Sequence, residues 1–438
     1  MLIKGQRTAH KRAMLLLLLG LGIATQSTSV CAVQIEHLAY SGHGEPHIEY
    51  LKERAQAFRA KTGIEVEINV AASDPAQQIL IRAIAGTPPD AMDVYPSAAG
   101  GLMANGVFED LTPWFMKDPT YRISDLVPPS LDLWRGAKGE IFAIPPDVVG
   151  VAVAYAAPRF HEAGLQTPRT MGREWTWETV LKITPMLVSD TDGDGRYDRF
   201  GVCSQFTDLL GAVLPMQQAG THFFDKPVNP TKAHFNTPEM LESLKYMREV
   251  WRLQGNSDGP AIWNGKTALD LYFQAGFIGY MVKPGVDIEW EMVHQPIGPA
   301  DSSTWIGNMG YEIGAGSNHK EAAWQWVTFI ALDRESMNKR VRATGRIPSY
   351  LPYLRGFNYA RIFGQNVPSS INVFVEQLQD TAGFRVLPYP VSPAFHPIRR
   401  AWNPVAQRFL RGELAAEALV EEMQKIAEVN IQDLVIAP

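Results

Sequence analysis

Cysteine is scarce in this chain, since only two of its 438 residues are cysteines. That excludes a disulfide-rich scaffold and a zinc or iron–sulfur site built from several cysteines. An excess of positive charge is missing too, because 40 Lys and Arg face 46 Asp and Glu, for a formal charge of −6. The composition therefore gives no general electrostatic reason to bind nucleic acid. With 46% hydrophobic and 20% charged residues, the chain has an ordinary globular composition and length for two or three domains.

A hydrophobic run long enough to cross a membrane is also missing. Residues 13–24 are apolar but too few, because a spanning helix needs roughly 20 residues, and no later segment reaches that length without charges. Four basic residues precede this run and small residues, Val30 and Ala32, follow it, which is the pattern of a secretory signal peptide over residues 1–32. We therefore expect a soluble, exported, periplasmic protein. Its mature chain has 36 basic and 46 acidic residues, a charge near −10.

Cys31 leaves a lipid anchor open as an alternative. A lipobox has Gly, Ala or Ser before its cysteine, whereas Val30 stands there, so cleavage after Ala32 is the preferred interpretation. The mature chain then keeps only Cys203, in an apolar stretch that is typical of a buried free thiol.

The first part of the mature chain alternates between strand and helix patterns. Strands are predicted at residues 33–40, 64–70 and 92–95, and helices at 47–61 and 76–85. This order predicts a parallel α/β sheet, in which ligands bind at loops beyond the carboxyl ends of the strands. Those loops are residues 40–45 and 95–101. Later in the chain, strands are predicted at 141–144, 148–155 and 277–281, and helices at 177–187, from 238 onward, at 319–332 and at 412–429.

Several short segments in fixed order carry a resemblance to a known family. They are residues 61–66 (KTGIEV), 86–90 (GTPPD), 105–113 (NGVFEDLTP), 139–145 (GEIFAIP), 160–165 (FHEAGL), 175–178 (WTWE), 273–281, 317–324 (SNHKEAAW) and 345–348 (GRIP). Together they span nearly the whole mature chain. The chain resembles the extracellular solute-binding proteins of ABC importers, in the sugar-binding family that includes maltose-binding protein.

The resemblance implies an α/β fold of the two-lobe periplasmic binding protein type (type II-like), with a cleft between lobes joined by hinge strands. It places one lobe at residues 33–148 plus 310–356 and the other at 149–309 plus 357–438. The chain would cross between them near 147–150, 309–311 and 355–358. It implies a monomeric carrier that captures a mono- or oligosaccharide or sugar derivative by hinge closure and delivers it to permease subunits in the inner membrane. No enzyme activity, nucleic acid or required cofactor is implied.

Candidate ligand-binding residues follow from the chemistry of sugars and from position in loops. A sugar needs planar aromatics for its C–H face, and carboxylates, amides and Arg for its hydroxyls. The candidates are Tyr40, Ser41, His43, Glu45, Tyr95, Ser97, Asp147, Gln205, Asp208, Asp287, Trp290, Trp305, Asn308, Arg346 and His396. Trp290 and Trp305 are expected in loops. Arg346 and Arg400 would be important for binding if the ligand were acidic.

An acidic loop is the sharpest local motif. Its candidate metal-binding residues are Asp190, Asp192, Asp194, Arg196 and Asp198, with Gly195 at the turn. The spacing is that of the start of an EF-hand calcium loop, but Gly201 stands where the final Glu is required. A structural Ca²⁺ and a solvated Asp/Gly hairpin therefore both remain open.

Two other function classes are alternatives to a carrier of neutral sugars. A secreted carbohydrate-active enzyme would need two carboxylates placed across a cleft, and the sequence has no nucleophile elbow, HExxH or Gly-rich phosphate loop. The stronger alternative is a binding protein for a charged or polyol-type ligand, such as a glycerophosphodiester or a sulfonated or acidic sugar. Fold analogy cannot choose among these ligands.

Overall fold

A computed structural model describes residues 33–436, except 72–74, 137, 227–229, 255–261, 283–284, 365–366, 379–385, 389 and 393. The predicted signal peptide, residues 1–32 with Cys31, lies outside the described residues. Val33–Pro438 forms one compact unit. Within its described part, every helix is too short or too polar to cross a membrane.

The first sheet has four strands in the order β2-β1-β3-β9. β1 (Gln34–Tyr40) pairs in parallel with β2 (Glu65–Ala71) and β3 (Ala91–Val94), while β9 (Gly310–Ile313) pairs antiparallel with β3. The parallel sheet predicted for the first part of the chain is thus confirmed. The helix between β1 and β2 ends where predicted, because Gly63 adopts the left-handed conformation that terminates helices.

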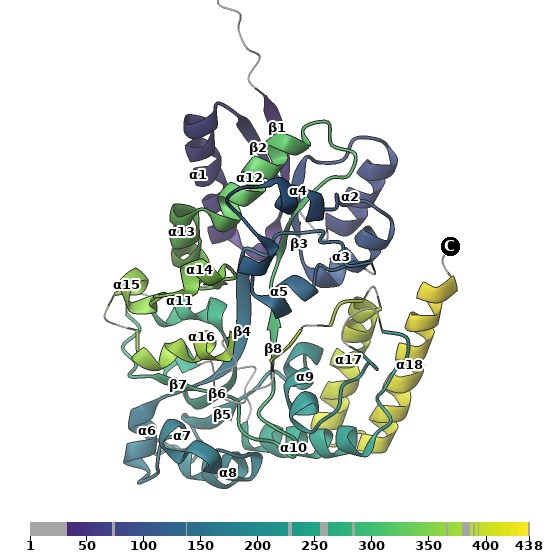
Figure 1. Cartoon of the computed structure of the whole chain (residues 1–438). Helices are drawn as coiled ribbons and strands as arrows, with labels where there is room; N and C mark the ends of the chain where they lie inside the picture. The colour runs from purple at the N-terminus through teal and green to yellow at the C-terminus, as the bar shows by residue number, and fades with distance from the viewer. Residues whose placement is uncertain are drawn as a thin grey trace, which may run out of the picture. The chain divides into compact units, whose positions relative to one another are not determined.

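The second sheet has seven strands, with the path β11-β8-β4-β6-β5 and with β7 and β10 also paired to β4. Its strands are β4 (Asp147–Tyr155), β5 (Phe200–Cys203), β6 (Thr267–Gln274), β7 (Glu291–Val293), β8 (Thr304–Gly307), β10 (Ile347–Pro348) and β11 (Val386–Pro388). The first residues of β4 pair with β10 and β8, and its last residues pair with β6 and β7. β4 is therefore the strand that leads from the region of the first sheet into the second (Figure 1).

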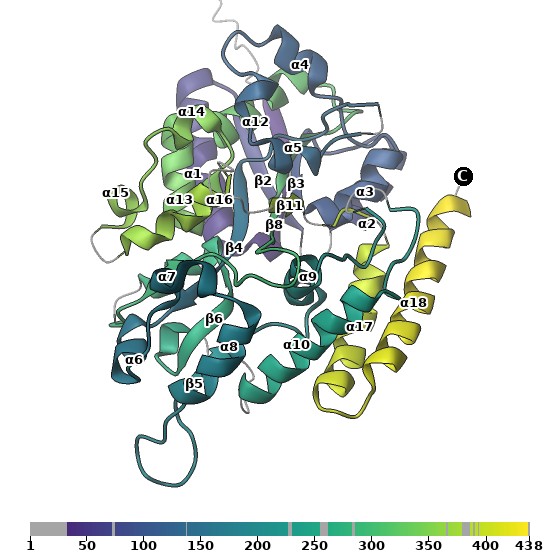
Figure 2. The same cartoon turned by 60° about the horizontal axis from the view of Figure 1, so that its bottom comes forward.

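Helices cover both sheets. They are α1 (Glu45–Thr62), α2 (Pro75–Ile84), α3 (Pro96–Ala104), α4 (Thr112–Lys117), α5 (Pro128–Asp132), α6 (Ala157–Glu162), α7 (Pro168–Met171), α8 (Trp177–Ile183), α9 (Leu209–Gln218), α10 (Pro238–Gln254), α11 (Ile278–Met281), α12 (Lys320–Leu332), α13 (Arg334–Thr344), α14 (Leu351–Leu354), α15 (Tyr359–Phe363), α16 (Val373–Leu378), α17 (Phe395–Leu410) and α18 (Ala416–Ile436). α10, α17 and α18 lie side by side (Figure 2).

Three of the predicted elements differ in the structure. Residues 141–144 form only isolated bridges, at Ile141 and Ile144. The strand predicted at 277–281 is wrong, because residues 275–277 form a 3₁₀ turn and α11 follows. The apolar side chains Ile278 and Met281 are three residues apart and both buried, which is helical spacing. The helix predicted at 177–187 ends at Ile183 and continues as a 3₁₀ turn through Pro185, which has no N–H to donate to the helix.

Candidate ligand-binding cleft

A cavity of about 270 Å³ lies where strand ends of the two sheets meet. Tyr40 ends β1 and Tyr95 directly follows β3, so the first sheet contributes the carboxyl ends of two parallel strands. The second sheet and its helices supply the facing wall. The lining residues are Tyr40, Tyr95, Pro96, Val149, Leu210, Gln274, Trp305, Gly307, Asn308, Arg346, His396 and Arg399. This is the position at which open α/β sheets bind their ligands.

Six of the predicted site residues line this cavity, namely Tyr40, Tyr95, Trp305, Asn308, Arg346 and His396. Trp305 lies in β8 and not in a loop, and its indole N–H donates to the carbonyl of Leu210 at 3.0 Å. The hydrogen bond fixes the ring, which is 2% exposed, at the wall of the cavity. Tyr40 and Tyr95 meet edge to face, with ring centroids 5.6 Å apart. The cavity is therefore bounded by rigid aromatic surfaces of the kind that pack on a sugar.

Ser97 belongs to α3, and the remaining predicted residues stand outside the described lining. Ser41 and His43 follow Tyr40 in a 3₁₀ turn. Glu45, Gln205 and Asp287 are exposed. Trp290 is 4% exposed and packs against Phe273 in a hydrophobic cluster, so its ring serves the core. Asp147 and Asp208 lie behind arginines of the cavity wall and hold them.

Sequence reasoning missed several lining residues, and Arg399 is the most polar of them. The prediction named Arg400 on the same helix, but Arg400 is exposed and Arg399 lines the cavity. Arg399 is held by Asp208, whose carboxylate accepts from Nε at 3.0 Å and from Nη2 at 2.6 Å. The buried residues of α17, Phe395, Ile398 and Trp402, form one stripe along the helix. Arg399 is adjacent to this stripe, so the apolar spacing could have distinguished it from Arg400.

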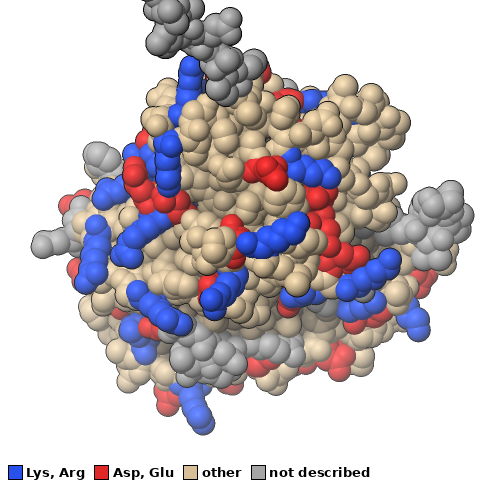
Figure 3. Space-filling view, turned by 45° about the horizontal axis from the view of Figure 1, so that its top comes forward, with Lys and Arg blue, Asp and Glu red and all other residues tan. Residues whose placement is uncertain are grey.

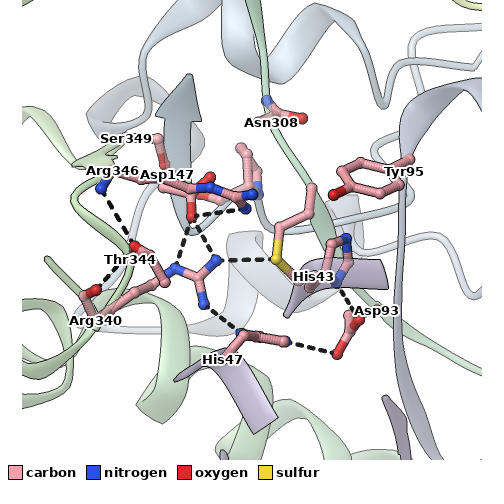
Figure 4. Close-up of polar contacts among 12 residues, drawn as sticks. His43, His47, Asp93, Tyr95, Asp147, Asn308, Arg340, Thr344, Arg346 and Ser349 are labelled. Carbon is pink, nitrogen blue, oxygen red and sulfur yellow. Dashed lines mark hydrogen bonds and ion pairs between the residues drawn. The ribbon is translucent and has the colours of Figure 1, made fainter. Parts of the chain in front are cut away.

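Behind Tyr40 and Tyr95, three histidines surround one buried carboxylate, that of Asp93. Figure 4 shows two of them, His43 and His47. Nδ1 of His43 lies 2.6 Å from Oδ1 of Asp93, and Nε2 of His47 and of His37 lie 3.1 and 3.0 Å from Oδ2. Trp326 donates its indole N–H to Nδ1 of His37, so His37 carries its proton on Nε2. Arg340 likewise donates to Nδ1 of His47. Each histidine thus donates one N–H to Asp93.

Burial sets the charge states of this cluster. It lowers the pKa of His47 to about 3 and lowers the pKa of His43 as well, against the opposing pull of Asp93. Burial alone would raise the pKa of Asp93, but the surrounding histidines hold it well below its usual range. The result is one ionised carboxylate among neutral imidazoles. Nitrogens and oxygens of His43, His47 and Asp93 lie within 4.8 Å of one another, as metal ligands would, but the hydrogen bonds account for that spacing.

Asp147, at the start of β4, links this cluster to the cavity wall. Its Oδ2 accepts from Nε of Arg340 at 2.8 Å and also pairs with Nη2 of the same guanidinium. Arg346 approaches the same oxygen with Nη1 at 3.9 Å (Figure 4). All three side chains are mostly buried, with 1% of Asp147, 2% of Arg340 and 16% of Arg346 exposed. One carboxylate therefore serves two guanidiniums, and this trio carries a net charge of +1.

The acidic loop projects from the fold between α8 and β5 (Figure 2). Oxygens of Asp190, Asp192 and Asp194 lie within 4.8 Å of one another. The carboxylate of Asp190 accepts the backbone N–H groups of Gly193 and Gly195 at 2.7 and 2.8 Å. Asp198 instead accepts from Thr191, and the backbone N–H of Arg196 donates to Asp194. Backbone hydrogen bonds thus balance part of the negative charge here, and they lower the pKa of Asp190.

A second, larger cavity of about 690 Å³ is lined by Arg169, Trp175, His294, Glu376 and neighbouring residues. All its lining residues come from the part of the chain between 168 and 376, without a contribution from β1 or β3. It therefore lacks the strand-end loops that make the smaller cavity a candidate site.

Comparisons with known proteins agree with this architecture. The family model described as bacterial extracellular solute-binding protein matches residues 44–336. No curated protein matches the chain closely enough in sequence to count as a relative.

Solved structures match over nearly the whole chain. The sugar-binding protein MalE from Xanthomonas citri superposes with a TM-score of 0.75 at 16% identity, covering 92% of this chain and 98% of that one. An ABC substrate-binding protein from Listeria monocytogenes in complex with cycloalternan gives 0.72 at 19% identity, covering 92% and 99%. A solute-binding protein from Agrobacterium radiobacter K84 in complex with ribitol gives 0.71 at 18%, covering 91% and 98%. The fold is the two-lobe solute-binding fold, and the chain belongs to the bacterial extracellular solute-binding protein family.

Proposed function

We propose that this protein captures a carbohydrate in the 270 Å³ cavity and delivers it to an ABC importer. The single observation that carries the proposal is the cavity itself, in which strand ends of one sheet face an aromatic and polar wall of the other. Family members of the same fold are described in complex with cycloalternan, maltotriose and ribitol, which supports a sugar or polyol as ligand.

The proposed mechanism is hinge closure. One lobe would be residues 33–148 plus 310–356 and the other 149–309 plus 357–438. The strands of the two sheets divide in the same way, except β10, which lies within 310–356 but pairs with β4 of the second sheet. β4 and the segment from Asn308 to Gly310 connect them, next to the cavity. A ligand held by both walls favours the closed state by its extra contacts there, and the closed form would dock on the permease. Tyr40, Tyr95, Trp305, Asn308, Arg346, His396 and Arg399 are the proposed contacts.

The remaining parts of the proposal follow from the family and the sequence. The family binds substrates and performs no catalysis, and we propose that this chain acts as a monomer in the periplasm without a required cofactor. Figure 3 shows basic and acidic side chains interspersed over one face of the molecule, which supports the absence of a nucleic-acid partner. Calcium at Asp190, Asp192 and Asp194 stays a prediction.

A thermal-shift screen of sugars and polyols, followed by calorimetric titration of each hit, tests the function. A ligand that binds the folded state raises the melting temperature by mass action. Tyr95→Ala removes an aromatic wall of the cavity and should weaken binding about tenfold or more, since a buried aromatic contact contributes about 1.5 kcal/mol or more. Tyr197→Ala is the matched control, because Tyr197 is 63% exposed in the acidic loop.

Two results would contradict the proposal. One is a screen without any stabilising sugar, polyol or sugar acid. The other is measurable hydrolysis of an oligosaccharide at stoichiometric protein, which would point to an enzyme.

A further inference from the structure

The charged side chains described in the wall of the cavity are all basic. Among the residues that the structure describes, the lining includes two arginines, Arg346 and Arg399, and a histidine, His396, but no Asp or Glu. A neutral sugar presents hydroxyl groups that donate as well as accept, and carboxylates of the wall normally receive those donors. Asp147 and Asp208 stand behind the arginines. Asp208 accepts from Arg399 with both oxygens, whereas Asp147 accepts from Arg340 with Oδ2, and its buried Oδ1 has no partner among the described residues.

The guanidinium of Arg346 has no hydrogen-bonded acceptor among the described residues. The Arg346 side chain is 16% exposed, and its closest charged partner is Asp147 at 3.9 Å, beyond hydrogen-bond length. Its backbone N–H donates to the hydroxyl of Thr344 at 3.2 Å. Asp147 is already bound by Arg340 through two nitrogens. A guanidinium has five N–H donors, and a buried one requires acceptors.

From this we infer that the natural ligand is an acidic sugar or polyol, whose carboxylate, phosphate or sulfonate group is bound by Arg346. Such a group only accepts hydrogen bonds, which suits a wall of donors, and its planar or tripodal oxygens fit a guanidinium bidentately. The inference rests on the proposed function and names the ligand class of that same site.

The surroundings of Arg346 support this role. The trio of Arg340, Arg346 and Asp147 keeps a net charge of +1, which the ionised Asp93 of the neighbouring histidine cluster offsets. Arg346 is the member of the trio that lines the cavity and would meet an incoming anion. Asp147 acts as a positioning residue, because it draws Arg346 toward β4 at the edge of the cavity. Asn308, which also lines the cavity, is less available to a ligand, since its Oδ1 accepts from Trp134 and its amide nitrogen donates to Ser130.

Matched pairs of ligands test the inference by calorimetric titration of the mature chain. We would compare glucose with glucuronate and with glucose 6-phosphate, and glycerol with glycerol phosphate. We expect an acidic member to bind roughly 10- to 100-fold more tightly than its neutral partner, as befits a charge-assisted hydrogen-bonded pair. Arg346→Gln should remove most of that difference. Raising the salt concentration should weaken the acidic ligand selectively.

Arg400→Gln is the control, because it removes the same charge from an exposed position on α17 outside the cavity. Its affinities should equal those of the wild type. Neutral members that bind as tightly as acidic ones, or an Arg346→Gln protein that keeps the preference, would overturn the inference and leave the carbohydrate function standing. If none of these ligands bound, the result would count against the proposed carbohydrate-binding function itself. Should Arg346→Gln fail to fold, the paired comparison on the wild type alone decides.

Discussion

Glu312 is a buried carboxyl, and its replacement gives a quantitative prediction. It lies on β9 opposite Met92 of β3, is 0% exposed, and neither carboxylate oxygen has a side-chain hydrogen-bond partner among the described residues. The backbone groups of Glu312 and Val94 offset the effect of burial only in part. Burial, followed by the negative charge of Asp93, raises the pKa of Glu312 well above its usual value. The folded protein therefore keeps this carboxyl protonated at a pH where the unfolded chain has released the proton.

The sign follows from proton linkage. A raised pKa of an acid means that its contribution to stability is complete below the unfolded pKa of about 4.5 and is lost as pH rises toward the folded pKa. One proton changes the free energy of unfolding by about 1.4 kcal/mol per pH unit, so the wild type loses up to that amount for each pH unit between the unfolded and the folded pKa. Glu312→Gln cannot ionise. It should therefore become more stable than the wild type by a margin that grows with pH.

Urea unfolding of both ligand-free proteins at pH 5, 6, 7 and 8 measures this margin. The buried histidines act in the opposite direction, because their lowered pKa values destabilise the fold as pH falls below about 6.5, but they are common to both proteins and cancel in the difference. Glu289→Gln, an exposed control, should run parallel to the wild type. Parallel profiles for Glu312→Gln as well would refute the argument that this carboxyl is buried without compensation.

Three further predictions concern other parts of the fold. Arg340→Met leaves the buried Asp147 without its main partner and should lower the free energy of unfolding by about 3–5 kcal/mol; a loss under about 1 kcal/mol would contradict the pairing. Trp305→Phe loses the hydrogen bond to Leu210 and should cost about 1–2 kcal/mol in the same urea assay, whereas no loss would mean that this bond does not hold the ring. If the acidic loop binds calcium, CaCl₂ should raise the melting temperature and Asp190→Asn should abolish that rise; an unchanged temperature would leave a hydrogen-bonded turn.

The sequence predicted best what depends on local periodicity. Strands β1, β2 and β3 alternate in hydrophobicity, and their order implies parallel pairing, so Tyr40 and Tyr95 could be placed at one edge of the sheet. The strand predicted at 277–281 failed because a short apolar run does not separate strand from helix by itself.

Long-range partners could not be predicted in this way. His37, His43 and His47 meet Asp93 across about 50 residues of sequence, and Arg340 meets Asp147 across 193. No spacing within the chain encodes such contacts. The same limit applies to Trp290. Its position in the sequence suggested a place in the cleft, but its ring packs against Phe273 in the core.

The central claim is that a carbohydrate occupies the cavity bounded by Tyr95, Trp305 and Arg346, and a crystal structure of the protein with the tightest ligand from the screen tests it most directly. The account predicts the sugar between Tyr95 and the wall formed by Trp305, with its acidic group on the Arg346 guanidinium. A ligand found instead in the larger cavity beside Trp175 and His294 would contradict it.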